Sequence, residues 1–245
     1  MIKSLNKYLF ALHILRRAGK SFLNNEDVLW KHNLHLEVVY REFFILQRCK
    51  GKNVLHVGFV DFPLTIERVL REELFHLQLK KVCNILIGID NQLEAVSTYQ
   101  KLTSDKDVMV GDIYEFDKVP INFGKFDIIL VSEVIEHLSN PGIALQKIRN
   151  AIVYDTEVLI TVPNSYRYAG FISALNNIDY IHPDHKAYYS PHSLIRLLCE
   201  NNFEPFEIYM YLYGNKEKVT DPVFLKFPII ADGIIAVCKK NERTK

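Results

Sequence analysis

The sequence predicts an α/β protein with a doubly wound, mostly parallel sheet of seven strands. Two observations support this prediction. Short apolar segments alternate with longer segments of helical periodicity, which is typical of βαβ units. The last two apolar segments are instead joined by a loop without a helix, so they are expected to form an antiparallel strand pair. Helices are expected before the sheet begins, as an N-terminal helical extension.

Length and composition fit one domain of this kind. The chain has 245 residues, of which 49% are apolar and 24% charged, and its net charge is +1. This length allows a sizeable core, and the small net charge makes an extended nucleic-acid surface unexpected. We expect the helical extension over residues 1–45 and the main domain over residues 46–245.

Cysteine usage and hydropathy indicate a cytoplasmic protein. Cys49, Cys83, Cys199 and Cys238 show no CxxC spacing, so we expect buried, reduced thiols rather than disulfides or a zinc site. The sequence has no run of 18 apolar residues, so no membrane-spanning segment is expected.

Residues 1–20 contain five Lys or Arg residues, no acidic residue, and leucines near helical spacing. The apolar stretch is short, is interrupted by His13 and is followed by no A-x-A site, which argues against a signal peptide. A basic amphipathic helix at a membrane surface is one interpretation. A helix that covers the domain or forms a homodimer face is favoured, because most apolar helical stripes face a protein core.

The parallel strands are expected where apolar residues form short runs. The fourth run, "FDIILVS", is apolar almost throughout, as in a strand buried on both faces. The five runs cover residues 52–58, 84–90, 107–112, 126–132 and 156–164. Helices are expected between them at 63–82, 92–102 and 141–152.

The end of the chain follows a different pattern. A helix is expected over residues 190–202, because Ser190 is a suitable N-cap and Pro191 fits the first helical position. Strands are expected over residues 203–214 and 229–240, with a loop between them.

Candidate site residues follow the predicted strands, because ligands of open parallel sheets bind beyond the carboxyl ends of the strands. Asp90 ends the second strand, where a carboxylate either binds ribose hydroxyls or caps the next helix. Asp112 ends the third strand and is expected near an adenine amino group, with Ile113 against the ring. The other cofactor-binding candidates are His56, Gly58, Phe59, Asn91, Ser132 and Glu133.

Several motifs together resemble a class I S-adenosylmethionine-dependent methyltransferase. They are "LIGID", "VGDIYEF", "FDIILVSEVIEHLSNPGIALQKI", "VLITVPN" and "HPDHKAYYSPHSLIRLLCENNFEP". "FDIILVSEVIEHLSNPG" is the most specific, being similar to the fourth-strand motif of small-molecule and sugar methyltransferases. The closing segments resemble the branch found in bacterial surface-polysaccharide gene clusters. The resemblance implies a Rossmann-like fold, S-adenosylmethionine as cofactor, and O-methylation of a sugar or glycan precursor.

The first strand departs from the family pattern, which is an acidic residue followed by Gly-x-Gly-x-Gly. This chain has His56 in the acidic position and keeps only Gly58. The loop either binds the cofactor through a wider turn, has lost binding, or binds something else. We favour the wider turn, because S-adenosylmethionine has no pyrophosphate and Gly58 permits close backbone approach. His56 either bonds into the site or is a buried structural residue. A nicotinamide enzyme is not expected, because its pyrophosphate needs G-x-G-x-x-G.

Catalysis of methyl transfer depends mainly on alignment of the nucleophile, and a hydroxyl nucleophile also benefits from a general base. His137 follows the fourth strand, where it acts either as this base or as support for its loop. His185 lies in the insert "IHPDHKAYYS", a usual place for a substrate lid in this fold. The resemblance favours His185 over His182 as base.

The same insert is expected to bind the acceptor. Its imidazole and carboxylate groups suit sugar hydroxyls, and its tyrosine rings suit a sugar face. The candidates are His182, Asp184, Tyr188 and Tyr189. A His-Asp-His cluster can also hold a divalent metal. The spacing matches no specific metal motif, so no metal is predicted.

Two other functions remain compatible with the sequence. The reduced glycine loop would also suit a catalytically silent binding or scaffold subunit. An N-methyltransferase, or an enzyme with a small aromatic acceptor, is compatible too, because the acceptor rests on family analogy alone.

Overall fold

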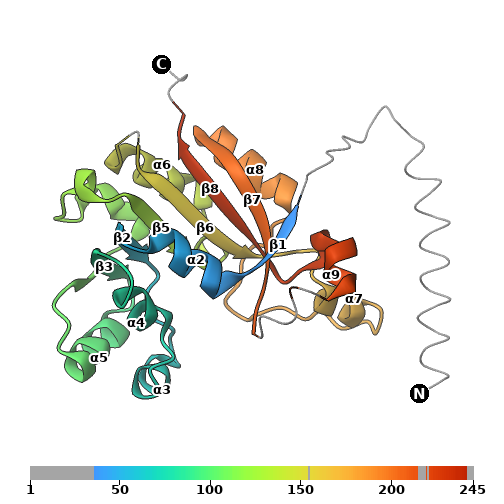
Figure 1. Cartoon of the computed structure of the whole chain (residues 1–245), viewed down its shortest axis with the longest axis horizontal. Helices are drawn as coiled ribbons and strands as arrows, with labels where there is room; N and C mark the ends of the chain where they lie inside the picture. The colour runs from blue at the N-terminus through green and yellow to red at the C-terminus, as the bar shows by residue number, and fades with distance from the viewer. Residues whose placement is uncertain (1–35, 154, 215–218, 220, 242–245) are drawn as a thin grey trace.

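The computed structural model describes residues 36–153, 155–214, 219 and 221–241. These residues form one eight-stranded sheet with helices on both faces (Figure 1). The strands are β1 (Glu37–Tyr40), β2 (Asn53–Val57), β3 (Ile85–Asp90), β4 (Val108–Val110), β5 (Ile128–Ser132), β6 (Glu157–Pro163), β7 (Phe203–Leu212) and β8 (Gly233–Lys240).

The strand order is β1-β7-β8-β6-β5-β2-β3-β4. β8 runs antiparallel to both β6 and β7, and all other neighbouring pairs are parallel. The chain adds β3 and β4 on one side of β2 and returns to place β5 on the other side. The doubly wound sheet and its terminal antiparallel pair are confirmed, and the change of direction at β2 and β5 is where such sheets bind ligands.

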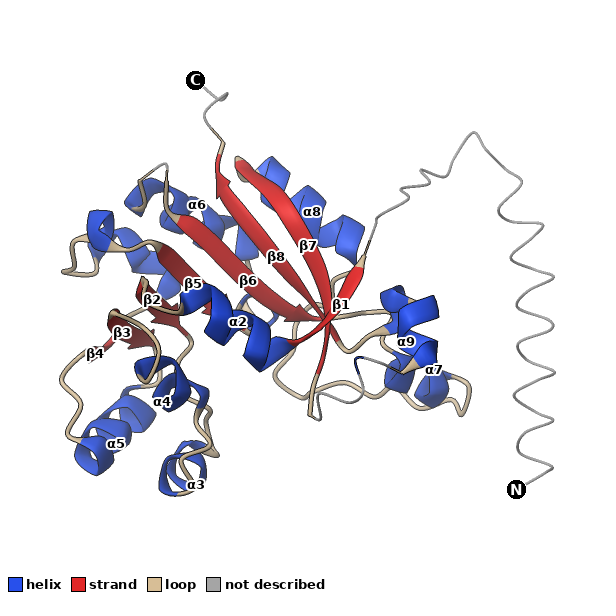
Figure 2. Cartoon of the chain, viewed as in Figure 1, coloured by secondary structure: helices blue, strands red, loops and turns tan. Residues whose placement is uncertain are grey.

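Helices cover the sheet on two faces (Figure 2). Apolar side chains of α2 and α4 pack in one cluster with one face of the sheet, and those of α6 and α8 pack on the other. The α-helices are α2 (Arg41–Cys49), α3 (Thr65–Leu70), α4 (Phe75–Lys80), α5 (Leu93–Thr103), α6 (Pro141–Ala151), α7 (Tyr168–Ala174), α8 (Pro191–Glu200) and α9 (Pro222–Lys226). The short 3-10 helices are η1 (Ile113–Lys118), η2 (Phe123–Lys125), η3 (Ile135–His137) and η5 (Pro228–Ile230).

The predicted start of α8 is present with the expected chemistry. The Ser190 hydroxyl accepts a hydrogen bond from the Ser193 backbone N–H. In return, the Ser193 hydroxyl accepts from the Ser190 backbone N–H and lies within donating distance of the Ser190 carbonyl. Pro191 occupies the first turn of α8. α6 begins in the same way, with the Asn140 side chain as cap and Pro141 in the first turn.

The predicted sheet lacked one strand. Residues 37–40 were expected to be helical but form β1, which pairs in parallel with the end of β7. Four residues show too little periodicity to identify a strand, and the pairing partner lies far along the chain. The helix expected over 63–82 is two helices, α3 and α4, because the backbone at Glu72 turns into the left-handed region.

The region between the last two strands is also more helical than expected. The predicted loop contains α9, and the final strand begins at Gly233, after η5, rather than at residue 229. α7 was not predicted either. The expected helix in residues 1–20 lies outside the described residues. Within the described ranges, no helix is both long enough and apolar enough to cross a membrane.

The cysteines are free thiols, as predicted, and all four lie in the described part of the chain. Cys49 and Cys238 are buried, whereas Cys83 is half-buried and Cys199 is exposed. The expectation that all four are buried is therefore wrong for Cys83 and Cys199.

Candidate active site

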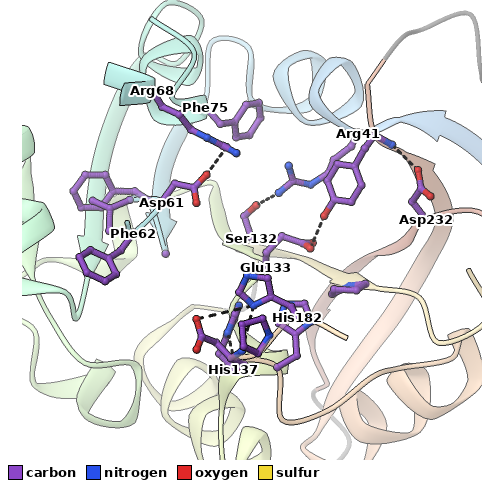
Figure 3. Close-up of a pocket in the computed structure, with 18 of the residues that line it drawn as sticks. Arg41, Asp61, Phe62, Arg68, Phe75, Ser132, Glu133, His137, His182 and Asp232 are labelled. Atoms are coloured by element: carbon purple, nitrogen blue, oxygen red, sulfur yellow. Dashed lines mark hydrogen bonds and ion pairs between the residues drawn. The ribbon is translucent and has the colours of Figure 1, made fainter. Parts of the chain in front are cut away.

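Two adjoining cavities lie beyond the carboxyl ends of β2, β3 and β5. The larger cavity, shown in Figure 3, has a volume of about 680 Å³, and the smaller has about 530 Å³. The loop after β2 and the segment after β5 line both of them. The residues common to both are Gly58, Val60, Phe62, Glu133, His137, Pro183 and Asp184.

The loop after β2 turns at its single glycine. Gly58 has a φ of 75°, a conformation that favours glycine, and its N–H donates to the Ile89 carbonyl at 2.9 Å. A Cβ placed on Gly58 would come within 2.3 Å of the Val134 side chain. The loop therefore has no room for a larger residue at this position, independent of any ligand.

Side chains hold the rest of this loop in place of the missing glycines. Phe59 is buried and packs against His76 and Tyr99. The Asp61 N–H donates to the Thr65 hydroxyl at 3.1 Å, and the Asp61 carboxylate pairs with Arg68. Phe59 therefore anchors the loop in the core, and Asp61 fastens it to α3. The backbone of the loop lies beside both cavities.

Asp90 ties this loop to the end of β3. One carboxylate oxygen accepts from the Val60 N–H at 3.3 Å and the other from the Gln92 N–H at 3.0 Å. Asp90 is buried, and burial raises the pKa of its carboxyl. It lines the smaller cavity together with Asn91. Asp90 is therefore not the N-cap of α5, which is Gln92 and makes no side-chain cap bond. Its carboxylate lines the lobe where a ribose was predicted.

Asp112 is exposed and caps η1, because its carboxylate accepts from the Tyr114 N–H at 2.9 Å. It is not among the described residues that line either cavity, whereas its neighbours Gly111 and Ile113 line the smaller one. Ile113 therefore lies where an adenine ring was expected, and Asp112 lies at the rim.

His56 is buried and pairs with another histidine. Its Nδ1 lies 3.2 Å from Nδ1 of His76, so one ring donates and the other accepts. Burial lowers the pKa of both imidazoles, that of His76 to about 3. His56 also lines the larger cavity. Of the two interpretations left open for His56, the geometry favours the structural one, because its Nδ1 is already used.

Glu133 lies at the centre of a polar cluster that connects β5, β6 and β7. One oxygen accepts from Thr161 at 2.7 Å and from Tyr211 at 2.8 Å, and the other accepts from Tyr213 at 2.6 Å. Glu133 has a φ of 54°, which is uncommon for a residue with a side chain. This backbone conformation and three donors fix the carboxylate beside both cavities.

Arg41 joins this cluster from the first residue of α2. Its guanidinium donates to the Ser132 hydroxyl and lies 5.7 Å and 5.6 Å from the ring centroids of Tyr211 and Tyr213. Arg41 is buried, lines the larger cavity, and has no hydrogen-bond partner for Nε among the described residues. It provides a positive charge opposite the Glu133 carboxylate (Figure 3).

Arg41, Thr161, Tyr211 and Tyr213 were missed by sequence reasoning. The alternating tyrosines at the end of β7 were a signal that aromatic side chains share one face of that strand. Arg41 gave no such signal, because it lies in a segment without a recognisable motif.

Three imidazoles meet between η3 and the insert before α8. The ring of His185 lies 4.7 Å from that of His137 and 4.8 Å from that of His182, between centroids. His137 Nδ1 is 3.2 Å from the Asp184 carbonyl, and His185 Nδ1 is 3.2 Å from the Tyr188 hydroxyl. The structure therefore brings both predicted general bases together at the boundary of the two cavities.

The tyrosines of the insert lie differently from the prediction. Tyr189 is buried in the core and is not among the described residues lining either cavity, so its ring is not available to stack on a sugar. Tyr188 lies behind His185 and accepts a hydrogen bond from the His182 N–H at 3.1 Å. Tyr180, which was not predicted, is exposed and lines the larger cavity.

Glu136 directly precedes His137 in the motif after β5. Its side chain is completely buried, and neither carboxylate oxygen has a hydrogen-bond partner among the described residues. Burial, together with the nearby Glu133 carboxylate, raises the pKa of Glu136 to about 9. Glu133, not Glu136, is therefore the carboxylate of this motif that lines the cavities.

Comparisons with solved structures give the same fold. A SAM-dependent methyltransferase from Thermotoga maritima is 15% identical, with a TM-score of 0.56 over 82% of this chain and 90% of that one. A SAM dependent methyltransferase from Archaeoglobus fulgidus is 18% identical, with a TM-score of 0.53 over 81% and 94%. Magnesium protoporphyrin IX methyltransferase from Synechocystis PCC 6803, solved with bound SAH, is 10% identical, with a TM-score of 0.53 over 82% of each chain.

No curated protein sequence matches this chain. A family model for the methyltransferase domain matches residues 64–208, from the start of α3 into β7. The match begins after the Gly58 loop, so the unusual segment lies outside it. S-adenosylmethionine, the cofactor predicted from the sequence, agrees with this assignment. Because the match covers more than half of the chain, the protein belongs to the methyltransferase domain family.

Proposed function

We propose that this protein transfers the methyl group of S-adenosylmethionine to a hydroxyl of a small acceptor, and that the acceptor is a sugar or glycan precursor of a surface polysaccharide. The observation that supports this most is the pair of adjoining cavities that share Glu133 and His137. A two-substrate transferase needs one lobe for the cofactor and another for the acceptor, with the reacting atoms at their boundary.

In this proposal the adenosine occupies the smaller cavity. The Asp90 carboxylate accepts from the ribose hydroxyls, Asn91 lies beside them, and Ile113 packs against the adenine. Asp112 remains a proposed contact at the rim. The methionine end reaches the loop backbone at Gly58 and Phe59, where the Arg41 guanidinium is placed to attract its carboxylate.

The acceptor then occupies the larger cavity. His182 and Asp184 line it with polar groups, and Tyr180 adds a ring. His137 or His185 takes the proton of the acceptor hydroxyl. Burial and the neighbouring His137 and His182 lower the pKa of His185 to about 4. Its ring is therefore uncharged at neutral pH, but it is a weaker base than an ordinary imidazole.

The rival proposal is a catalytically silent binding or scaffold subunit. The observation that favours it is the loop after β2, which lacks the later family glycines and lies outside the family match. An N-methyltransferase, or an enzyme with a small aromatic acceptor, would use the same cofactor lobe.

Single-turnover methyl transfer separates these proposals. The full chain is loaded with radiolabelled S-adenosylmethionine and offered nucleotide sugars, lipid-linked sugars, amines and phenols in parallel. Label on a sugar supports the proposal. Label on an amine or a phenol contradicts the sugar acceptor and supports the N-methyltransferase or the small aromatic acceptor. Saturable cofactor binding with no label on any acceptor, nor on water as methanol, favours the silent subunit.

A further inference from the structure

A buried carboxyl group without a partner requires an explanation. Both oxygens of Glu136 are shielded from solvent and have no hydrogen-bond partner among the described residues. Buried polar groups are nearly always satisfied, and an exception often marks a bound water or ion. The hydroxyl of Tyr189, also buried nearby, is likewise without a partner in the described part of the chain.

Two imidazoles stand next to this carboxylate. His137 Nε2 lies 4.0 Å from Glu136 Oε1. One ligand atom each from Glu136, His137 and His185 can be chosen so that all three lie within 4.8 Å of one another. Ligands about 2.1 Å from one ion lie roughly 3–4 Å apart, so side-chain shifts of about 1 Å would close the set around a cation.

The backbone holds these three side chains together. The Lys186 and Ala187 N–H groups both donate to the Glu136 carbonyl, at 2.8 Å and 3.1 Å. These bonds fasten the insert to η3 and bring His185 close to His137. The two segments are distant in the sequence, since Asp184, which contacts His137, lies 47 positions after it.

The outer contacts of both rings also suit ligation. When the neutral His137 ring donates from Nδ1 to the Asp184 carbonyl, Nε2 carries no proton and its lone pair is free for a metal, 4.0 Å from Glu136 Oε1. Metal-bound histidines usually have such a carbonyl or carboxylate behind the ring. His185 Nδ1 is similarly engaged by the Tyr188 hydroxyl, which leaves Nε2 for the site.

We propose that Glu136, His137 and His185 form a binding site for a divalent transition metal ion at the boundary of the two cavities. Two imidazoles and one carboxylate are a donor set that suits Zn²⁺, with a fourth position left open. Mg²⁺ and Ca²⁺ prefer oxygen ligands throughout, so they should bind much more weakly. No metal was predicted from the sequence, because the spacing of His182, Asp184 and His185 matches no specific metal motif. In the structure His185 is instead grouped with Glu136 and His137.

The open position faces the space between the cavities, because His137 lines both and His185 lines the larger one. A cation there would coordinate an acceptor hydroxyl and lower its pKa, so that the hydroxyl would release its proton to water. His137 and His185 would then act as ligands and not as the general base. This catalytic role rests on the proposed function, whereas binding of the ion does not.

Metal titration of the full chain tests the site. Chelator-stripped protein is titrated with Zn²⁺ alone against a chromophoric competitor, and with Co²⁺ by visible absorption, without cofactor or acceptor. We expect one equivalent to bind. Glu136→Gln and His137→Ala should each weaken Zn²⁺ binding at least about 100-fold. Loss of a residue that only supports a ligand costs about 10- to 100-fold, so a larger loss indicates a direct ligand.

Two further variants serve as controls. His192→Ala removes an exposed imidazole on α8, and it should leave Zn²⁺ affinity unchanged. His182→Ala removes the third ring of the histidine cluster, and it should change affinity by less than about tenfold. Circular dichroism and melting of each stripped variant confirm that it is folded.

Stoichiometric binding to wild type that is lost in Glu136→Gln and kept in His192→Ala supports the site. No Zn²⁺ binding by wild type overturns it, as does wild-type affinity in folded Glu136→Gln. Loss in His182→Ala without loss in Glu136→Gln also overturns it, because the ion would then sit among imidazoles alone. Because the titration contains no methyl donor, absence of Zn²⁺ binding does not contradict the proposed transferase activity. Conversely, Zn²⁺ binding by a protein without transferase activity still supports the metal site.

Discussion

Asp90 illustrates how one side chain serves both the fold and the proposed site. Its two oxygens accept from the Val60 and Gln92 N–H groups, so it positions the loop after β2 and the start of α5. A carboxylate has about four acceptor positions, so these two bonds leave capacity for a ribose. The helix-cap alternative is not formed, because the N-cap of α5 is Gln92, and the two backbone bonds of Asp90 are compatible with a ribose ligand.

Asp90→Ala should weaken binding of S-adenosylhomocysteine by about 1–3 kcal/mol, or about 5- to 150-fold, because buried ribose hydroxyls would lose their acceptor. Calorimetric titration measures this directly. Asp127→Ala is the matched control, because Asp127 also accepts from a backbone N–H, that of Asn53, but at the amino end of the sheet. Equal affinities in folded Asp90→Ala and Asp127→Ala would contradict the ribose assignment.

Gly58→Ala should destabilise the protein even without cofactor. The added Cβ would lie 2.3 Å from the Val134 side chain and on a backbone of positive φ, so overpacking of about 1–3 kcal/mol is expected. Val134→Ala in the same chain should restore part of this loss by removing the clash. A double-mutant cycle by urea unfolding measures the coupling, and strictly additive effects would argue against this packing.

At the scale of elements, α2 has two arginines with separate tasks. Arg41, in the first turn, donates to Ser132 and lines the larger cavity. Arg48, in the last turn, pairs with Glu157 and Glu207, at 2.9 Å and 2.7 Å. One end of the helix therefore serves the site and the other fastens the helix to the sheet.

Arg41→Gln should weaken S-adenosylmethionine binding, because it removes the positive charge proposed to face the methionine carboxylate. About 1.5–3 kcal/mol is expected for a hydrogen bond to a charged group. Arg48→Gln should lower the melting temperature and leave cofactor affinity unchanged. The comparison needs both measurements on both variants. The assignment fails if Arg48→Gln affects binding as strongly as Arg41→Gln.

The elements also show what the sequence could predict. Strands such as β5 and helices such as α8 were predicted because apolar runs and caps are local signals. The loop residues Gly58 and Asp90 were found because strand ends are where such folds bind ligands. β1 and Arg41 were missed, because a four-residue strand and its partner β7 are connected by pairing across most of the chain.

For the whole molecule, the buried pair His56–His76 links stability to pH. Both rings have a pKa lowered by burial, that of His76 to about 3, whereas an unfolded histidine titrates near 6.5. Below pH 6.5 the unfolded chain therefore binds protons that the folded chain does not. The free energy of unfolding should fall progressively as the pH drops from about 6.5 toward 3.

His76→Phe should flatten this decline. The window from pH 7 to 5 is informative, because most carboxylates have not yet been protonated there. Urea unfolding at several pH values gives the slope for the variant and for wild type. An unchanged slope would mean that His76 titrates normally in the folded protein, contrary to its buried position.

We expect the two-lobed site to bind S-adenosylmethionine although its loop keeps only one glycine of the family pattern. Calorimetric titration of the full chain with S-adenosylmethionine at neutral pH tests it most directly. We expect saturable binding of one molecule, with a Kd between about 1 μM and 1 mM, the usual range for enzyme substrates. A folded protein that shows no binding up to millimolar cofactor would contradict it.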